Sequence, residues 1–171
     1  EPLAADAQGA AADGGSPEFE KACLRAANLA KLQRMLGSAV GAPQARVLAE
    51  VRAHIGAVGA CKARLRRQKG FPPDRTPADD NCLMAARLLL DQYISDGDEK
   101  WLVEAALVGR YGLQVSPTNF QFKLLLLRVL RLLGDWESYS DLFTQLDVKH
   151  ILWDTLSYLV LPAAWGWAAA S

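Results

Sequence analysis

SPTNFQFKLLLLRVLRLLGDW, residues 116–136, is the stretch of sequence that decides the fold. Ser116-Pro117 is expected to begin a helix, because a proline in the first turn loses no backbone hydrogen bond. The segment that follows is apolar almost all round, with Gln121, Arg128 and Arg131 along a narrow polar stripe. A helix with so little polar surface is normally sandwiched between other helices. The stretch therefore predicts a buried helix inside an all-α fold.

A Gly-Asp dipeptide recurs around this helix. Gly134-Asp135 follows it, and Gly97-Asp98 lies 37 residues earlier (134 − 97 = 37), again after a leucine-rich segment. The spacing is close to the ~34-residue period of tetratricopeptide repeats, and the aromatic Trp136 fits that pattern. Tyr139 stands where the pattern has a small residue. Since each helix pair buries its apolar face on its neighbours, the sequence predicts a tetratricopeptide-like α-α superhelix, with a generic helical bundle as the alternative.

Glycines, prolines and acidic side chains predict the ends of the other helices. Three prolines mark residues 70–77 as a loop, Asp79-Asp80-Asn81 is expected to cap the next helix, and Gly112 is expected to end the one after that. Gly56 and Gly59 are expected to allow close approach of a neighbouring helix. The predicted helices span residues 17–36, 43–65, 82–94, 99–111, 117–133, 136–146 and 149–161.

The chain divides into three parts. Residues 1–16 are mostly alanine, glycine and aspartate and are predicted to be disordered, because they hold too little apolar surface to offset the entropy of folding. Residues 17–161 form the predicted helical-repeat domain, and residues 162–171 an irregular tail. Since the chain opens with Glu1, we expect that an amino-terminal region is missing. The first helix is expected to bury one face, made of Phe19, Cys23, Ala26, Leu29, Ala30, Leu32 and Leu36.

Charge, cysteine content and hydropathy argue against several classes of protein. The 171 residues hold 19 Lys plus Arg and 19 Asp plus Glu, which argues against a protein that coats nucleic acid through bulk charge. Three widely spaced cysteines fit a reducing cytoplasm better than a secreted disulfide framework. The most apolar stretches, residues 124–133 and 151–170, are too short or are interrupted by charged, proline or glycine residues, so no membrane segment is expected.

No arrangement of side chains with catalytic chemistry stands out. His54 and His150 are the only histidines, and neither lies at metal-ligand spacing from a cysteine. Cys23 and Cys82 fall on apolar helix faces, where inert core thiols are expected. We therefore expect no catalytic, cofactor, metal or small-molecule site in this sequence.

One short pattern calls for a separate interpretation. Residues 34–39, RMLGSA, match the loose Arg-x-x-Gly-x-Ala pattern of acetyl-CoA binding. That pattern binds a pyrophosphate when the N–H groups of a starting helix face it. Here the segment closes a helix, where carbonyl groups are exposed instead. We therefore interpret Gly37 as the residue that caps the end of the first helix.

A basic cluster is the strongest local charge feature. It has no acidic residue among its members, and it could contact ribosomal RNA or another anionic surface. The alternative is a solvated helix end whose cations complement the helix dipole. The cluster consists of Lys62, Arg64, Arg66, Arg67 and Lys69.

Two motifs resemble a known family. The first is residues 116–128, continuing to Leu133-Gly134, and the second is LDVKHI, residues 146–151, followed by DTLSYL, residues 154–159. At this separation they resemble the auxiliary subunit of the NatB N-terminal acetyltransferase, whose pattern is Ser-Pro-x-Asn-x-Gln-Phe-Lys-Leu-Leu-Leu and then Leu-Asp-x-Lys-His-Ile-x-x-Asp-Thr-x-x-Tyr-Leu. The specific resemblance covers about residues 115–160 and is weaker upstream. It fails after Val160, where we expect a truncated or altered sequence.

The resemblance implies a division of labour between two subunits. In this family the catalytic subunit transfers an acetyl group from acetyl-CoA to nascent chains beginning Met-Asp, Met-Glu, Met-Asn or Met-Gln. The auxiliary subunit is a superhelical scaffold that wraps the catalytic subunit and supports ribosome attachment. We therefore expect a cytoplasmic, non-catalytic scaffold that binds the NatB catalytic subunit. Two other functions stay open, a tetratricopeptide adaptor that binds a peptide in its concave groove and a small helical enzyme.

Overall fold

The computed structural model describes residues 17–37, 43–65, 75–76 and 78–146. Over these residues the chain is helical and contains no strand, so the all-α prediction is confirmed there. The predicted disordered segment, the seventh helix and the tail lie outside the described residues. The helices are α2 (Pro17–Met35), α3 (Gln44–Leu65), α4 (Asp79–Asp96), α5 (Lys100–Val115), α6 (Phe120–Leu133) and α7 (Trp136–Thr144).

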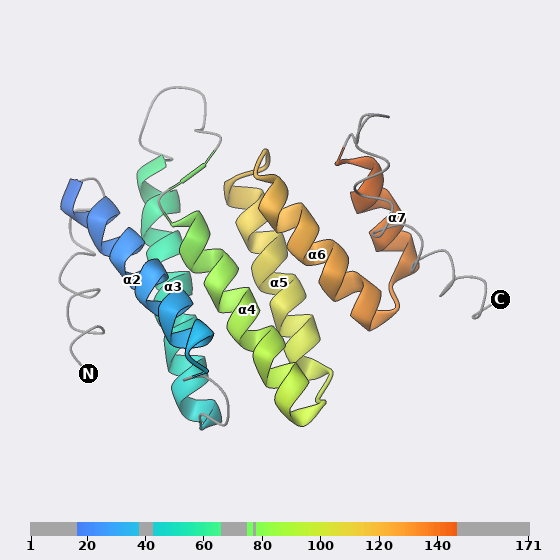
Figure 1. Cartoon of the computed structure of the whole chain (residues 1–171). Coiled ribbons are helices and arrows are strands. Elements are labelled where there is room, and N and C mark those ends of the chain that lie inside the picture. Colours follow the sequence, from blue (N-terminus) through green and yellow to red (C-terminus); the bar gives the residue numbers. More distant parts are fainter. Residues whose placement is uncertain (1–16, 38–42, 66–74, 77, 147–171) are drawn as a thin grey trace.

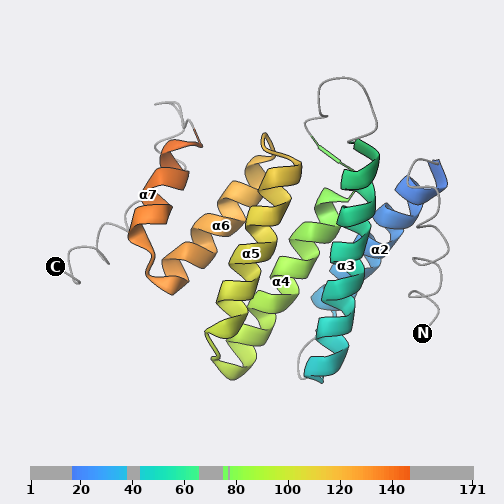
Figure 2. The same ribbon diagram turned by 180° about the vertical axis from the view of Figure 1, so that it is seen from behind.

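The helices form two layers. α2, α4 and α6 lie toward the viewer in Figure 1, and α3 and α5 lie toward the viewer after the half-turn of Figure 2. Each helix from α3 to α6 packs against the next one along the chain, while α2 packs mainly against α4. Consecutive helices therefore form antiparallel pairs that stack side by side, which is the arrangement that short turns between amphipathic helices favour. No helix in the described ranges combines the length and apolarity needed to cross a bilayer.

The recurring Gly-Asp dipeptide marks equivalent turns, as predicted. Gly97 and Gly134 have φ values of 74° and 72°, in the left-handed region that glycine adopts without steric cost. Their backbone N–H groups donate to carbonyls in the last turns of α4 and α6. The aspartates then start the next helices, because Asp98 accepts a hydrogen bond from the Lys100 N–H and Asp135 from the Ser138 N–H. Each dipeptide thus ends one helix and begins the next.

Gly37 caps the end of α2, which confirms its interpretation. Its φ is 73°, and its N–H donates to the Arg34 carbonyl at 3.0 Å. The Arg34 guanidinium forms a two-pronged pair with Asp91 of α4. The arginine of the RMLGSA pattern is therefore used to hold two helices together.

Three predicted helix ends were wrong. α4 begins at Asp79, inside the acidic triplet that was expected to precede it, and its N-cap residue Ala78 makes no side-chain cap bond. α6 begins at Phe120 and not at Ser116-Pro117, because the Asn119 side chain accepts from the Gln121 N–H and caps the helix there. α5 continues through Gly112 to Val115. In each case a residue typical of helix ends has a tertiary role instead.

The role of Gly112 is to let two helices approach closely. A Cβ atom at Gly112 would lie 2.4 Å from Cε1 of Phe122, and one at Gly109 would lie 2.9 Å from Cδ2 of Leu126. Both distances are far inside ordinary van der Waals contact, so α6 packs directly on the backbone of α5. The predicted close approach at Gly56 is wrong, because a Cβ atom there meets nothing within 4 Å. At Gly59 the nearest atom is the Tyr111 hydroxyl at 4.0 Å.

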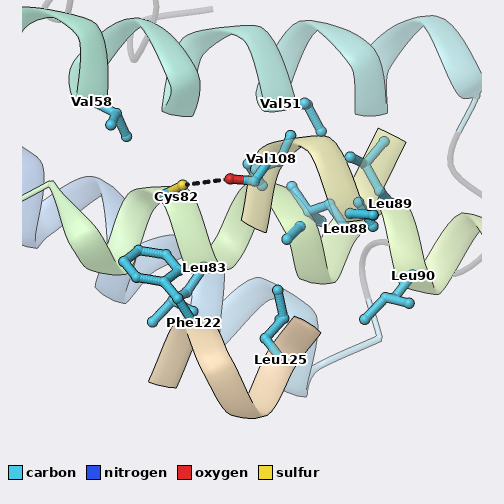
Figure 3. Close-up of a cluster of buried hydrophobic side chains, with 14 of the residues drawn as sticks. Val51, Val58, Cys82, Leu83, Leu88, Leu89, Leu90, Val108, Phe122 and Leu125 are labelled. Carbon is cyan, nitrogen blue, oxygen red and sulfur yellow. Dashed lines mark hydrogen bonds between the residues drawn. The ribbon is translucent and has the colours of Figure 1, made fainter. Parts of the chain in front are cut away.

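The core is built around α4 and α5. Its buried side chains come from α2 to α6 and include Val51, Val58 and Phe122 (Figure 3). The Cys82 thiol lies within this cluster and donates to the Val108 carbonyl at 3.4 Å. Burial of this much apolar surface stabilises the fold at about 25 cal/mol per Å².

A second cluster joins α6 to α7. It contains Leu126, Leu127, Leu130, Tyr139 and Leu142. Because Phe122 and Leu125 of the same helix belong to the first cluster, α6 packs between two groups of buried side chains, as its composition predicted. Tyr139 is buried despite standing where the repeat pattern has a small residue, and its ring packs edge-on against Trp136.

The face that α2 buries matches the predicted one only in part. Phe19, Cys23 and Ala30 are buried as predicted, together with Ala27, whereas Leu29, Leu32 and Leu36 are exposed. A spacing of three and four residues can be met by more than one stripe on the same helix. Here ion pairs from Lys31 to Asp80 and from Arg34 to Asp91 fix the rotation of α2 on α4. The stripe of smaller side chains therefore faces the core.

Candidate functional site

A buried carboxyl group lies where α4 and α6 begin. Asp79 is only 2% exposed. Its oxygens accept hydrogen bonds from the Thr76 N–H (3.1 Å), the Thr76 hydroxyl, the Ser116 hydroxyl (2.7 Å) and the Asn119 amide (2.8 Å). Because buried acceptors are costly when unpaired, this set of donors is what allows a carboxyl group here. Asp79 thereby joins the turn before α4 to the turn before α6.

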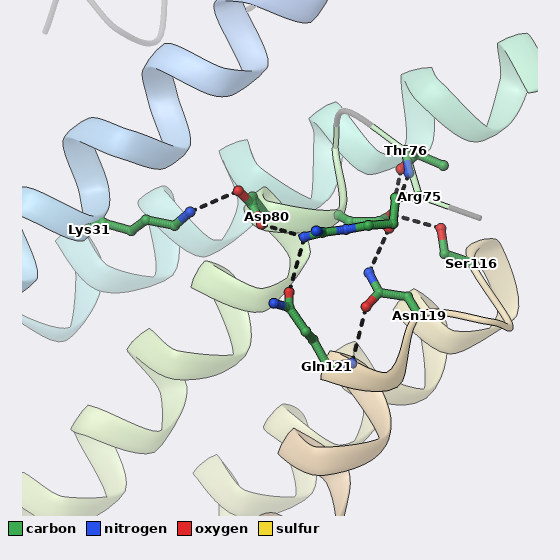
Figure 4. A network of polar contacts seen from close by, with 8 residues as sticks. Lys31, Arg75, Thr76, Asp80, Ser116, Asn119 and Gln121 are labelled. Carbon is green, nitrogen blue, oxygen red and sulfur yellow. Dashed lines mark hydrogen bonds and ion pairs between the residues drawn. The ribbon is translucent and has the colours of Figure 1, made fainter. Parts of the chain in front are cut away.

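Asp80 extends the same hydrogen-bond network toward the protein surface. Asp80 pairs with Lys31 of α2 at 2.8 Å and with Arg75 at 3.6 Å. The Arg75 guanidinium also donates to the Gln121 side chain at 3.2 Å, close to the start of α6 (Figure 4). These partly exposed contacts each contribute little to stability, typically about 0.2–1 kcal/mol. Their effect is to fix the position of α2 and of the turn before α4.

Asn81 completes the junction on the other side of α4. Its amide donates to the Cys23 carbonyl of α2 at 3.1 Å, and its oxygen accepts from Nδ1 of the buried His54 of α3 at 2.9 Å. Burial lowers the pKa of His54, because the imidazolium form loses hydration inside the protein. Three consecutive residues, Asp79-Asp80-Asn81, therefore tie α4 to α2, α3 and the start of α6.

This junction satisfies its own polar groups. Within the described residues, no buried polar side-chain atom lacks a hydrogen-bond partner, and no group of three or more metal-ligating side chains comes together. Burial raises the pKa of the Cys23 thiol to about 11 and that of the Cys82 thiol to about 12. Both thiols therefore stay protonated at neutral pH, when only a thiolate is a good nucleophile. The arrangement acts as a structural joint between helix pairs.

The basic cluster falls largely outside the described residues. Arg66, Arg67 and Lys69 belong to the undescribed part, and only the backbone of Arg64 is described. Lys62 is half-buried, and its ammonium group lies 4.8 Å from the centre of the Tyr111 ring. This cation therefore makes a contact within the protein, between α3 and α5.

α6 presents one exposed surface beside its buried sides. Phe120 is 58% exposed and Leu132 41% exposed. Arg128 is exposed as well, and Leu124 and Arg131 are half-buried. Residues separated by three and four positions lie along one side of a helix, so these five side chains form a continuous stripe, here called the α6 face. This surface combines exposed apolar side chains with two arginines.

The sequence held a clue to the Asp79 junction. Thr76-Pro77-x-Asp79 and Ser116-Pro117-x-Asn119 share one pattern, 40 residues apart (116 − 76 = 40). Each copy precedes a helix of the same layer, and the second copy donates two hydrogen bonds to the aspartate of the first. This repeat, more than the Gly-Asp dipeptide, identifies the residues through which successive helix pairs meet.

Comparisons with known proteins agree with the family that the two motifs indicate. The auxiliary subunit of human NatB, N-alpha-acetyltransferase 25, is 43% identical over 83 residues, which are 48% of this chain and 8% of the human protein. The mouse protein of the same name is 42% identical over the same length. A phagocyte signaling-impaired protein of Aedes aegypti is 35% identical over 89 residues, 52% of this chain and 10% of that protein.

The chain thus spans about a tenth or less of the length of these relatives. The similarity to the family nevertheless begins far upstream of the two motifs. The model of the N-acetyltransferase B complex (NatB) non-catalytic subunit family matches residues 4–165. Because this match covers nearly the whole chain, the chain belongs to the family of non-catalytic NatB subunits and is not itself the acetyltransferase.

Proposed function

We propose that this chain is part of a helical scaffold that binds and supports the catalytic subunit of NatB. The observation that carries the proposal is the family match over residues 4–165. The stacked helix pairs support it, because such pairs build extended surfaces for other proteins. In this function the partner supplies the acetyl transfer, and the scaffold supplies binding surface and rigidity.

The Asp79 junction explains how such a scaffold keeps its shape. Helix pairs that contact each other only through apolar side chains can slide, because the hydrophobic effect has no direction. Hydrogen bonds from Ser116 and Asn119 to Asp79 fix the position of one pair on the next. Together with the repeated Gly-Asp turns, they favour a tetratricopeptide-like superhelix. A subunit that acts on nascent chains would work in the cytoplasm, next to the ribosome.

Two parts of the proposal can be separated from the rest. Ribosome contact through the basic cluster would depend on Arg64, Arg66, Arg67 and Lys69, since Lys62 already contacts Tyr111.

A general tetratricopeptide adaptor is the second candidate function. The cationic α6 face favours this function, because such adaptors bind peptides through basic side chains. The two functions differ in their partner, which is a folded enzyme subunit in one case and a short peptide in the other.

Association with the catalytic subunit tests the proposed function. The 171-residue chain would be co-expressed with the tagged human NatB catalytic subunit, purified on the tag and sized by gel filtration. We expect the chain to co-purify in a stable complex, while the Leu127→Asp variant, which loses its core, does not. A folded wild-type chain that elutes alone at every protein concentration would reject the proposal.

Activity provides a second readout. In the human auxiliary subunit, the 83 residues that match this chain would be replaced by the matching segment of this chain. We expect the chimeric complex to acetylate a peptide beginning Met-Asp. The same replacement carrying Leu127→Asp serves as the matched control and should not support activity. An adaptor with no relation to NatB would give an inactive chimera in both cases.

A further inference from the structure

The charge on the α6 face is not compensated by neighbouring side chains. α6 contains Lys123, Arg128 and Arg131 and no acidic residue. The guanidinium groups of Arg128 and Arg131 form no hydrogen bond or ion pair with other residues in the part of the chain that the structure describes. By contrast, Arg34 of α2 and Arg75 in the turn before α4 are each paired with an aspartate. The α6 face therefore offers two arginines that are available to a partner.

Apolar side chains accompany these arginines along the stripe. Phe120 lies at one end and Leu132 at the other, with Leu124 between them. The stripe from residue 120 to 132 is about 18 Å long, since a helix rises about 1.5 Å per residue. That length matches about three turns of a second helix laid along it. Aromatic and arginine side chains are also the residues most enriched at protein interfaces.

The geometry points to the α6 face as a docking surface for an acidic amphipathic helix of a protein partner. Leucine-type side chains of that helix would cover Phe120, Leu124 and Leu132, and its carboxylates would pair with Arg128 and Arg131. Arginine suits this role because its planar guanidinium binds a carboxylate through two hydrogen bonds at once. The inference rests on the proposed function, in which the partner is the NatB catalytic subunit.

A protein helix fits this surface better than a nucleic acid does. Nucleic acid would need cations spaced to follow phosphates, with flat rings for the bases. The α6 face has two arginines within one turn, and the rest of the stripe is one aromatic ring, Phe120, and the aliphatic side chains of Leu124 and Leu132. Leucine offers nothing to a phosphate but covers apolar surface on a partner helix. The occupant is therefore a partner with both acidic and apolar side chains.

Charge reversal tests the inference. The Arg128→Glu/Arg131→Glu double variant would be compared with Lys21→Glu/Arg25→Glu, which makes the same change in charge at two exposed cations of α2. Affinity of the 171-residue chain for the purified catalytic subunit would be measured at low and at physiological salt. We expect the α6 reversal to weaken binding roughly tenfold or more and the α2 reversal to leave it within about twofold. Circular dichroism checks that both variants stay folded.

Two further variants separate charge from shape. Arg128→Lys/Arg131→Lys keeps the charge but loses the two-pronged geometry, so we expect a loss smaller than that of the reversal. Phe120→Ala removes apolar contact without changing charge, and it should weaken binding at both salt concentrations alike. Weaker binding of both Phe120→Ala and the charge-reversal variant would show that apolar and cationic side chains both contribute to the docking surface.

The possible results are distinct. If the wild-type chain does not bind the catalytic subunit, the proposed function fails. If the wild-type chain binds and the α6 reversal binds equally well, the docking surface is wrong while the proposed function stands. Equal weakening by both reversals would also overturn the inference, since attraction would then come from overall charge. The inference would likewise be overturned if the α6 reversal abolished binding of a single-stranded RNA oligomer but not binding of the catalytic subunit.

Discussion

Asp79, the first residue of α4, accepts a hydrogen bond of 2.8 Å from the side chain of Asn119, the residue that caps α6. Asn119 uses the oxygen of the same amide to accept from the Gln121 N–H. The Asn119 side chain thus caps the start of α6 and also binds the first residue of α4, in the preceding helix pair. The beginning of α6 and the position of α6 are therefore set by the same residue.

Removing the buried acceptor should be costly. In Asp79→Ala, the donors of Thr76, Ser116 and Asn119 lose their partner inside the protein, so we expect the free energy of unfolding to fall by about 3 kcal/mol. Urea denaturation followed by circular dichroism measures this loss. Asp141→Ala, at an exposed position of α7, is the matched control and should change stability by less than about 0.5 kcal/mol. Equal effects of both substitutions would contradict the role given to Asp79.

Two glycines inside helices should respond to alanine in opposite directions. Gly112→Ala places a methyl group against the Phe122 ring, and overpacking of this kind typically costs about 1–3 kcal/mol. Gly56→Ala meets open space and gains helix propensity, so it should stabilise the protein by up to about 1 kcal/mol. Thermal melting of the two variants gives the comparison. A stabilising Gly112→Ala would mean that α5 and α6 do not pack this closely.

The buried leucines of α6 should not tolerate charge. Leu126 and Leu127 are 2% and 0% exposed, so Leu126→Asp or Leu127→Asp would bury an unpaired carboxylate, at a cost of several kcal/mol. We expect both variants to lose helicity and cooperative melting. Leu107→Asp, at an exposed position of α5, is the control and should melt near the wild-type temperature. Cooperative wild-type melting of both α6 variants would show that α6 is not buried.

Mild acid should destabilise the protein through His54. Because its pKa is lowered in the folded state, the unfolded chain binds a proton below about pH 6.5 that the folded chain binds only at lower pH. The contribution of His54 to the free energy of unfolding is therefore fully present above about pH 6.5. It falls as the pH drops below that value, by at most about 1.4 kcal/mol per pH unit.

Comparison of wild type with His54→Gln isolates this contribution. Glutamine can still donate to Asn81 but does not titrate, so unfolding free energies measured from pH 7.5 down to pH 5.5, roughly the window in which a histidine titrates, should fall less steeply in the variant. Parallel curves for the two proteins would show that His54 has an ordinary pKa.

Thiol labelling should report global unfolding. Cys23, Cys61 and Cys82 are all buried, and burial raises the pKa of Cys23 and Cys82. We expect almost no reaction of the native protein with an aromatic disulfide reagent at mildly alkaline pH, and reaction of all three thiols in urea. Cys82→Ser serves as a control, because it should lower the total in urea by one. Fast labelling of the native chain would place a cysteine at the surface.

The sequence predicted the features that depend on neighbours along the chain. The helix ends at Gly97 and Gly134, the starts after Asp98 and Asp135, and the burial of Leu126 and Leu127 all follow from local periodicity and capping. The family was also identified from the motifs near residues 115–160, because those motifs combine several uncommon residues in a fixed order.

Contacts between residues that are distant in the sequence could not be predicted from local sequence patterns. Asp79-Asp80-Asn81 has the composition of a helix cap, and capping rules alone do not reveal its contacts with Lys31, His54 and Asn119, which are distant in the sequence. Gly112 shows the same ambiguity, since a glycine that ends a helix and one that admits a neighbouring ring have the same local pattern. The α6 face was missed because a helix so rich in leucine predicts burial, while its arginines become informative only when their lack of partners is known.

The close packing of α6 on Gly109 and Gly112 has a consequence for the geometry of a long array. α6 is about 21 Å long, since 14 residues rise about 1.5 Å each, and it carries α7 at its far end. A displacement of a few tenths of an ångström beside Phe122 would tilt α6, and the tilt would act as a lever on every helix stacked after it. Two absent methyl groups on α5 would therefore help to set the curvature of a longer array built from such helix pairs.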